Sequence, residues 1–301
     1  MTRGKISATG PELSRMVYGT WRMLDDAASA QDINRRLHRC VELGITTVDT
    51  AEIYGGYKVE AILGEALALS PGLRDTLEII TKAGIYIPCA AYPLRKVAHY
   101  DASGAQMVAS LETSLALLGT DQVEMFLVHR PDWLTGIDDT ASGLNQLLKS
   151  GKVRSIGVSN YSASQFDALN SRVDGGLVTN QVEFSLLRME PLFDGTFDQS
   201  QKLALRPMAW SPLAGGRLFA HGEAAAGRLE AAAASMKDKY NGASLEQIAY
   251  AWVMAHPSQP IPLIGSNKVE RIESAAAAAD LRIDREDWFA LWVAAQGHGI
   301  P

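Results

Sequence analysis

Residues 123–130 read Val-Glu-Met-Phe-Leu-Val-His-Arg, a short apolar run that ends in two polar side chains. A run of this length and composition is typical of a strand that is buried on both faces, as the strands of parallel sheets are. Before it, one face of an amphipathic helix is formed by Val108, Leu111, Leu115 and Leu118. The two patterns together predict a helix followed by a buried strand.

The same alternation recurs along the whole chain. Seven further strand-like runs are Met16–Tyr18, Thr46–Val48, Leu77–Thr81, Val153–Val158, Val178–Asn180, Pro207–Ala209 and Ile261–Ile264, and a helical pattern follows each of the eight. Eight such units predict an α/β fold of the closed (β/α)8 TIM-barrel type. An open doubly wound sheet is the alternative, but no GxGxxG segment follows the first strand.

Further features complete the fold prediction. Residues 3–15 predict an N-terminal hairpin, and an extra helix is expected at the C-terminus. Capping boxes at helix starts are predicted by Ser29 with Asp32, Ser162 with Gln165, and Ser244 with Gln247. Because α/β barrels of this size are single units, residues 1–301 are expected to form one domain.

Composition argues against several classes of function. The net charge of -6 and the absence of a Lys/Arg cluster argue against binding to nucleic acid or to an anionic membrane. No apolar run approaches the roughly 20 residues of a membrane span. Residues 1–10 lack the apolar region of a secretory signal, so a cytoplasmic protein is expected. The two cysteines fall in no metal-binding pattern, and no metal site is predicted.

Unusual polar residues occur where the predicted strands end. They are Gly19-Thr20-Trp21 after the first strand, Asp49 and Tyr54 after the second, Lys82, His129, Ser159-Asn160, Gln181 and Trp210 after the third to seventh, and Gly265-Ser266-Asn267 after the eighth. Each alone has an ordinary structural explanation, such as a helix cap or a solvated charge. In a barrel, however, the carboxyl ends of the strands converge on one face, where active sites lie. The set therefore predicts one active site.

The segments around these residues resemble those of the aldo-keto reductases, in particular the bacterial NADPH-dependent branch. The resemblance runs from about Met16 to Ala279 and is carried by Asp49-Thr50-Ala51-Glu52-Ile53-Tyr54-Gly55, Thr81-Lys82, Leu127-Val128-His129-Arg130-Pro131-Asp132, Gly157-Val158-Ser159-Asn160, Asn180-Gln181-Val182-Glu183, Trp210-Ser211-Pro212-Leu213 and Ile264-Gly265-Ser266-Asn267-Lys268-Val269-Glu270-Arg271. It implies a (β/α)8 barrel without a Rossmann domain. The implied activity is the reversible, NADPH-dependent reduction of small aldehydes and ketones to alcohols.

Carbonyl reduction explains the polar residues at the second to fourth strand ends. It needs a hydride on carbon and a proton on oxygen, and Tyr54 is the expected proton donor. A phenol pKa of about 10 is too high for easy donation. We therefore expect Lys82, oriented by an ion pair with Asp49, to stabilise the phenolate. His129 is expected to orient the carbonyl, which makes these four residues the predicted catalytic set.

The remaining residues are expected to bind the cofactor. By resemblance, the cofactor-binding residues are Gly19, Thr20, Trp21, Ser159, Asn160, Gln181, Trp210, Ser211, Leu213, Arg217, Gly265, Ser266, Asn267 and Arg271. Trp210 suits the nicotinamide ring. Arg271, beside the free N–H groups of a helix start, suits the 2′-phosphate and favours NADPH over NADH. Gly265 and Ala275 stand where many family members have lysine and asparagine, which reduces the expected preference.

Two other functions fit part of this pattern. A lysine at a barrel strand end also forms Schiff bases, so Lys82 allows an aldolase. An aldolase, however, has no use for the polar series after the fifth to seventh strands. A cofactor-binding regulatory module of the same fold is the second alternative.

The substrate itself is not predicted by any pattern, because it depends on loops that vary freely. Aromatic residues in those loops suggest an aromatic or apolar pocket: Trp21, Tyr86, Tyr92, Tyr100 and Trp133. The sequence carries no signature of an oligomeric state.

Overall fold

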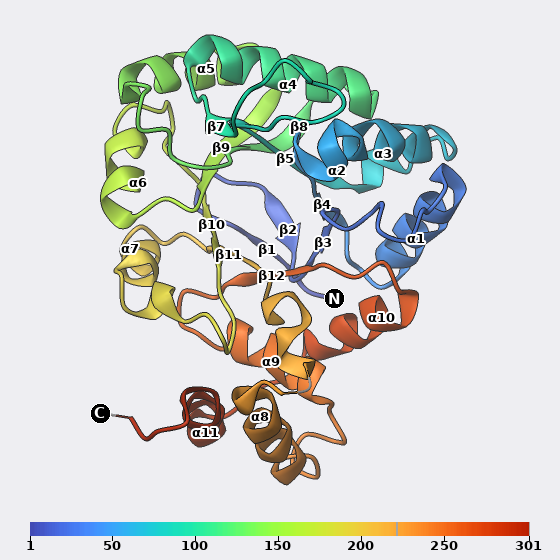
Figure 1. Ribbon diagram of the computed structural model, residues 1–301, viewed down its shortest axis with the longest axis vertical. Helices are drawn as coiled ribbons and strands as arrows, with labels where there is room; N and C mark the ends of the chain where they lie inside the picture. Colours follow the sequence, from blue (N-terminus) through green and yellow to red (C-terminus); the bar gives the residue numbers. More distant parts are fainter. Residues whose placement is uncertain (221, 301) are drawn as a thin grey trace.

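The computed structural model describes residues 1–220 and 222–300 and contains a closed barrel of eight parallel strands (Figure 1). Along the chain, the barrel strands are β3 (Val17–Gly19), β4 (Thr47–Asp49), β5 (Glu78–Ala83), β8 (Val123–Val128), β9 (Val153–Ser159), β10 (Asn180–Glu183), β11 (Met208–Trp210) and β12 (Ile261–Ile264). Each strand pairs with the next, and β12 pairs with β3 to close the ring. This confirms the predicted TIM barrel.

Helices surround the barrel (Figure 1). They are α1 (Ala30–Glu42), α2 (Tyr54–Tyr57), α3 (Val59–Ala68), α4 (Gly104–Leu118), α5 (Ile137–Lys149), α6 (Ala163–Asn170), α7 (Thr196–Lys202), α8 (Ala224–Ser235), α9 (Leu245–Met254), α10 (Val269–Ala278) and α11 (Arg285–Gln296), with short 3-10 helices η1 (Arg74–Thr76), η2 (Glu190–Leu192) and η3 (Ala214–Phe219). The three predicted capping boxes are present at α1, α6 and α9. Among the described residues, no helix combines the length and the apolar character that a membrane crossing needs.

Several strands extend one residue beyond the apolar runs that predict them. The final residues of β4, β9 and β11 are Asp49, Ser159 and Trp210. Parallel pairing explains the extension, because the ladder continues to Asp49, which lies opposite Gly19 on one side and Ile80 on the other. The predicted strand Val178–Asn180 is wrong at its start, since β10 begins at Asn180 and runs further. The polar site residues are thus held by sheet hydrogen bonds.

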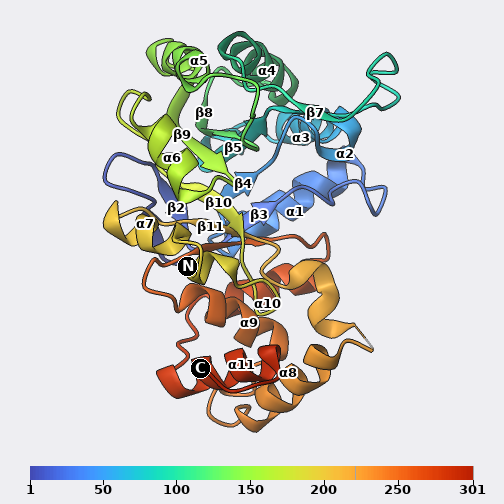
Figure 2. The ribbon, with the colours of Figure 1, turned by 60° about the vertical axis from the view of Figure 1, so that its left-hand side comes forward.

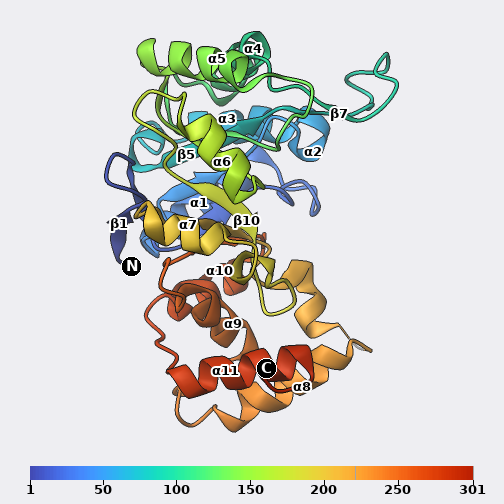
Figure 3. The same cartoon turned by 90° about the vertical axis from the view of Figure 1, so that its left-hand side faces the viewer.

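A hairpin covers the amino-terminal end of the barrel. It consists of β1 (Arg3–Lys5) and β2 (Glu12–Ser14), which pair antiparallel as predicted. Ile6 and Leu13 are fully buried and belong to the same apolar cluster as Met125 and Ile261 of the barrel strands. Figure 3 shows the hairpin at one end of the barrel and the loop with β7 (His99–Tyr100) at the other. The carboxyl ends of the strands therefore remain the open end.

The extra C-terminal helix is present, and α11 lies with α8 in a layer outside the barrel (Figure 2). Trp288 of α11 stacks on Trp252 of α9, with ring centroids 4.7 Å apart and planes inclined by 7°. Each indole N–H also donates to the backbone carbonyl of the other residue, at 3.0 and 3.1 Å. These contacts fix α11 against α9, a helix that borders the open end of the barrel.

Candidate active site

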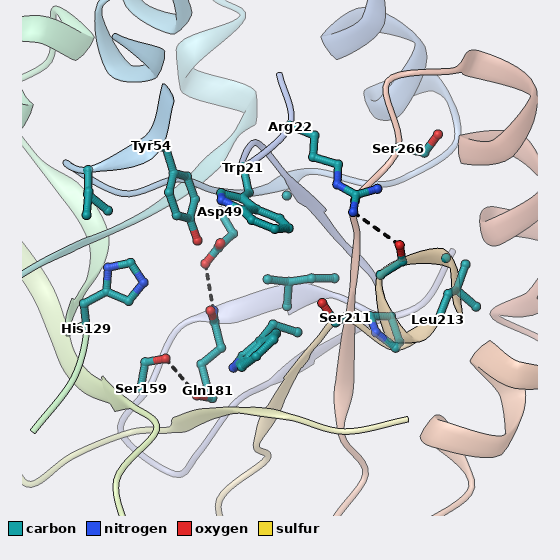
Figure 4. Close-up of a pocket in the computed structure, with 18 of the residues that line it drawn as sticks. Trp21, Arg22, Asp49, Tyr54, His129, Ser159, Gln181, Ser211, Leu213 and Ser266 are labelled. Carbon is teal, nitrogen blue, oxygen red and sulfur yellow. Dashed lines mark hydrogen bonds between the residues drawn. The ribbon is translucent and has the colours of Figure 1, made fainter. Parts of the chain in front are cut away.

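A cavity of about 780 Å³ lies at the carboxyl ends of the barrel strands. Its lining comes from strand ends and the loops that follow them, and includes Gly19, Asp49, Tyr54, His129, Ser159, Gln181, Trp210 and Gly265. Figure 4 shows Trp21, Tyr54, His129 and Gln181 around the same space. The predicted convergence of polar residues on one face is thus observed.

Asp49 and Lys82 form a buried ion pair at the floor of this cavity. Lys82 Nζ donates to Asp49 Oδ1 at 2.6 Å and to the backbone oxygen of Thr50 at 2.7 Å. The two side chains are 1% and 0% exposed. Gln181 Nε2 donates to the other oxygen, Asp49 Oδ2, at 2.8 Å (Figure 4). Both carboxylate oxygens therefore have partners, as a buried charge requires.

Tyr54 lies beside this ion pair, at the start of α2. Lys82 Nζ is 4.9 Å from the centre of the Tyr54 ring. Burial raises the pKa of Tyr54 above its usual value, and the positive charge of Lys82 opposes that rise. Burial disfavours the charge on Lys82, but Asp49 and Tyr54 outweigh it and raise the lysine pKa. At neutral pH the phenol is therefore protonated and the lysine is charged.

His129 directly follows β8 and approaches the Tyr54 ring edge-on, with ring centroids 5.9 Å apart. Burial, with the charges of Lys82 and Arg130, lowers the pKa of His129 well below its usual value. The imidazole is therefore neutral at pH 7. Its Nδ1 atom is buried and has no hydrogen-bond partner within the described part of the chain. The N–H group of a neutral imidazole beside Tyr54 can donate a hydrogen bond to a substrate oxygen.

A second network joins the ends of β9, β10 and β11. Trp210 Nε1 donates to Asn160 Oδ1 at 3.0 Å, and Asn160 Nδ2 donates to Ser159 Oγ at 2.8 Å. Ser159 Oγ in turn donates to the backbone oxygen of Gln181 at 2.8 Å. Asn160 has a φ of 61°, a left-handed conformation that asparagine tolerates better than most residues. The network fixes the Trp210 indole on the same wall as the backbone of Gln181.

The structure brings most of the predicted site residues together. Asp49, Tyr54 and His129 line the cavity, and Lys82 lies behind Asp49. The predicted cofactor residues at the cavity are Gly19, Trp21, Ser159, Asn160, Gln181, Trp210, Ser211, Leu213, Gly265, Ser266 and Arg271. Three predicted cofactor residues lie outside the lining, namely Thr20, Arg217 and Asn267. The Asn267 amide instead donates to the backbone oxygen of Arg22 at 2.6 Å.

The pocket has the expected aromatic or apolar character, but most of the aromatic residues expected to form it lie elsewhere. Of the five aromatic residues expected there, Trp21 lines the cavity, whereas Tyr86 is buried elsewhere. Tyr100 packs against Trp133 with ring centroids 5.8 Å apart. The apolar wall is built by isoleucines in the loops after β4 and β5: Ile53, Ile85 and Ile87.

Two charged lining residues were missed by sequence analysis. Arg22 donates to the backbone oxygen of Gly215 at 3.3 Å and so bridges the loops after β3 and β11 (Figure 4). Glu246 lies in the first turn of α9, after the N-cap Ser244. Acidic residues are common in the first turn because they complement the helix dipole. Its sequence context therefore gave no indication of a place in the site.

Comparison with known proteins identifies the family. A model of the aldo/keto reductase family matches residues 15–292. The chain belongs to the aldo/keto reductase family. It is 45% identical over 296 residues to Oxidoreductase YdhF of Escherichia coli (strain K12), and the match covers 98% of each chain. It is 43% identical over 290 residues to the 6-dehydroglucose reductase of Agrobacterium fabrum, with 96% of each chain covered.

The fold agrees with solved structures of the family. An aldo/keto reductase from Klebsiella pneumoniae, solved in complex with NADP and acetate, superposes with a TM-score of 0.77 at 27% identity. The superposition covers 96% of this chain and 94% of that protein. This aldo/keto reductase is thus an NAD(P)H-dependent oxidoreductase that acts on carbonyl compounds.

Proposed function

We propose that this aldo/keto reductase catalyses the NADPH-dependent reduction of small aldehydes and ketones, with Tyr54 as the proton donor. The observation that carries the proposal is the buried Asp49–Lys82 pair beside a protonated Tyr54 and a neutral His129. Tyr54 and His129 both line the cavity, so a carbonyl oxygen between them can hydrogen-bond to the phenol and the imidazole.

Each residue has its own task in this reaction. The raised pKa keeps Tyr54 protonated until the carbonyl oxygen gains negative charge. As the proton leaves, the Lys82 ammonium stabilises the phenolate, and Asp49 keeps that ammonium charged and in place. His129 orients the same oxygen. The bound cofactor supplies the hydride.

The wall formed by β9 to β11 fits the nicotinamide end of the cofactor. Gln181 Nε2 is bonded to Asp49, which leaves Gln181 Oε1 to accept a hydrogen bond from a carboxamide. Trp210 lines the cavity with its indole fixed by Asn160, and its face suits a flat ring. The reductase from Klebsiella pneumoniae that was solved with NADP supports the same cofactor class.

The loop after β12 and the start of α10 fit the phosphate end. A Cβ at Gly265, or at Gly216 of η3 on the same cavity, would meet no atom within 4 Å, so phosphate groups can approach the backbone at both places. Ser266 and Arg271 line this end of the cavity. Free N–H groups at a helix start and a guanidinium both favour an anion, which supports a preference for NADPH.

The NADPH preference can be tested at Arg271. A charge-assisted hydrogen bond is worth roughly 1.5–3 kcal/mol, so Arg271→Ala should weaken NADPH binding about tenfold or more. NADH lacks the 2′-phosphate, and its Kd should stay near the wild-type value. Fluorescence titration with both cofactors provides the measurement. Equal wild-type affinities, or a variant that loses both cofactors alike, would contradict this preference.

We extend the proposal to hydroxylated aldehydes as the substrate class. The relative from Agrobacterium fabrum is a 6-dehydroglucose reductase. Arg130 lines the cavity directly after His129, and it forms no ion pair within residues 1–220 and 222–300. This guanidinium lies near the expected position of the carbonyl group. It can donate hydrogen bonds to hydroxyl oxygens of a substrate.

A Schiff-base aldolase finds little support. Such an enzyme needs an amine that is neutral and open to the substrate. The Lys82 side chain is 0% exposed, donates to two acceptors and has a raised pKa. Sodium borohydride added with a keto substrate should therefore trap no adduct on Lys82.

The activity is tested by NADPH oxidation with a panel that contains 6-dehydroglucose, glyceraldehyde, unsubstituted aliphatic aldehydes, ketones and quinones. We expect one alcohol formed for each NADPH consumed, with the highest kcat/KM for the hydroxylated aldehydes. A protein that binds NADPH but oxidises it with no carbonyl would be a regulatory module. An unsubstituted aldehyde as the best substrate would remove the role given to Arg130.

A further inference from the structure

Tyr57 occupies a strained position in the turn that carries Tyr54. In α2, the residues Gly55, Gly56 and Tyr57 have φ values of 58°, 65° and 70°. Glycine adopts this left-handed conformation freely, but tyrosine rarely does. Such strain persists where surrounding contacts fix the residue, and it gathers at functional sites. The contacts of Tyr57 therefore indicate which function depends on this conformation.

The hydroxyl group of Tyr57 holds the loop that follows β5. It donates to the backbone oxygen of Ile85 at 3.2 Å and accepts from the backbone N–H of Ile87 at 3.2 Å. Ile85 and Ile87 are the two residues of this loop that line the cavity. The turn with Tyr54 and the apolar wall are thus joined through one phenol.

Arg95 completes this contact from the far part of the same loop. Its Nη1 donates to Tyr57 Oη at 2.7 Å. Its guanidinium carbon lies 3.7 Å from the ring centroid of Tyr92, 4.8 Å from that of Tyr86 and 5.2 Å from that of Tyr57. Cation–π contacts and a hydrogen bond therefore hold one side chain in one place.

The base of this loop is also held by the antiparallel pairing of β6 (Ile85–Tyr86) with β7, whereas its tip is exposed. Figure 2 shows it extending from the barrel beside β7, and Leu94 at its tip is 93% exposed. The tip thus lacks an apolar core beneath it, and its position depends on local contacts such as those of Arg95.

We propose that Tyr57 and Arg95 are positioning residues that set the apolar wall of the substrate site. By fixing Ile85 and Ile87 relative to Tyr54, they select carbonyl compounds whose substituent has an apolar part that reaches this wall. The inference rests on the proposed function for its kinetic test. Its physical basis, the restraint of the loop by one hydroxyl group, can be measured without turnover.

The test uses three single variants and the double variant Tyr57→Phe/Arg95→Met. Tyr57→Phe keeps the ring and removes the hydroxyl group, and Arg95→Met removes the guanidinium. Lys96→Met is the matched control, because Lys96 is the exposed cation next to Arg95. KM and kcat are measured with octanal as a long aldehyde and propanal as a short one, and the NADPH Kd is measured separately.

We expect Tyr57→Phe and Arg95→Met each to raise KM for octanal about tenfold, the effect of one lost charge-assisted hydrogen bond. KM for propanal, kcat and the NADPH Kd should stay near wild type, as should every constant of Lys96→Met. The double variant should resemble Tyr57→Phe, because Arg95 acts through the Tyr57 hydroxyl group that this substitution removes. An unchanged KM for octanal, or an equal rise for propanal, would overturn the inference.

Hydrogen exchange gives the readout that needs no substrate. In Tyr57→Phe the Ile87 amide loses its acceptor, so it should exchange about tenfold faster, whereas Lys96→Met should exchange like wild type. Unchanged exchange at Ile87 would overturn the inference by itself. If the wild type oxidises NADPH with no carbonyl compound of the panel, the proposed function fails, and the exchange result still decides whether Tyr57 restrains the loop.

Discussion

Lys82 carries a positive charge at a place that water does not reach. Its side chain is 0% exposed, and its two acceptors are the carboxylate of Asp49 and the backbone oxygen of Thr50. Removing one partner of a buried pair leaves the other charge uncompensated, at a cost of about 3–5 kcal/mol. The state of Lys82, and through it that of Tyr54, therefore depends on Asp49.

Loss of either member of this pair should therefore impair catalysis. We expect Lys82→Met and Asp49→Asn each to lower kcat about 100-fold or more, the range of general acid catalysis. The double variant should lose little beyond the larger single loss, because both substitutions act through the Tyr54 phenol. Steady-state kcat with saturating NADPH is the measurement. A double variant whose loss equals the product of the two single losses would speak against a shared mechanism.

Glu52, two residues before Tyr54, affects the stability of the fold rather than catalysis. Its Oε2 atom is buried without a partner among the described residues, and burial raises the pKa of this carboxyl to about 7 from a usual 4.5. A raised carboxyl pKa means that folding is favoured while the group is neutral. The free energy of unfolding that depends on neutral Glu52 is fully present below about pH 4.5. It is lost as the pH rises to about 7, the pKa of this carboxyl in the folded state.

We therefore expect Glu52→Gln to flatten the dependence of stability on pH. Urea unfolding at pH 5 and pH 8 should show that the variant loses less free energy of unfolding over this range than wild type. The difference should be about 3 kcal/mol at most, from 1.36 kcal/mol for each pKa unit. Glu65→Gln, which removes an exposed carboxyl from α3, is the control and should behave as wild type. Identical pH dependence in Glu52→Gln and wild type would contradict the raised pKa.

At the scale of elements, α4 and α5 approach closely at a pair of glycines. A Cβ at Gly143 would lie 2.3 Å from the backbone oxygen of Gly104 and 2.4 Å from its Cα. Backbone atoms cannot turn aside as a flexible side chain can, so a methyl group there must move the helices apart.

Gly143→Ala is therefore expected to lower the free energy of unfolding by about 1–3 kcal/mol, the cost of overpacking. Gly227→Ala in α8 is the control, because a Cβ there meets no atom within 4 Å. In the control, alanine should stabilise the helix by up to about 1 kcal/mol. Urea unfolding of both variants measures the difference. Equal stabilities of the two variants would show that α4 and α5 can move apart without a loss of free energy of unfolding.

Sequence patterns predict elements well where one physical cause dominates. The apolar run of β8, interrupted only by Glu124, matches the observed strand, because burial on both faces favours apolar residues. The end of β10 is missed, because its pairing with β9 and β11 continues into the polar residues Gln181 and Glu183. The proposed catalytic set is predicted because its residues lie at or after the ends of three successive barrel strands. Ile85, Ile87 and Glu246 are missed because loops and helix starts follow no such pattern.

At the scale of the whole molecule, closure of the barrel gathers the site. Asp49 of β4 and Gln181 of β10 are separated by 132 positions in sequence, yet they are joined by a 2.8 Å hydrogen bond. The repeated strand–helix pattern predicts this closure, since eight units form a ring. It cannot predict the contact between Tyr57 and Arg95, which depends on a left-handed turn and a long loop. That residues 1–301 form one domain stays a prediction.

The most direct test of the account is the rate of a single turnover in Tyr54→Phe. Enzyme with bound NADPH is mixed with the best aldehyde of the panel, and NADPH absorbance is followed by stopped flow. We expect the rate constant to fall about 100-fold or more, while the NADPH Kd stays close to wild type, because only the proton donor is lost. A variant that binds NADPH normally and keeps more than about a tenth of the wild-type rate would show that Tyr54 is not the acid.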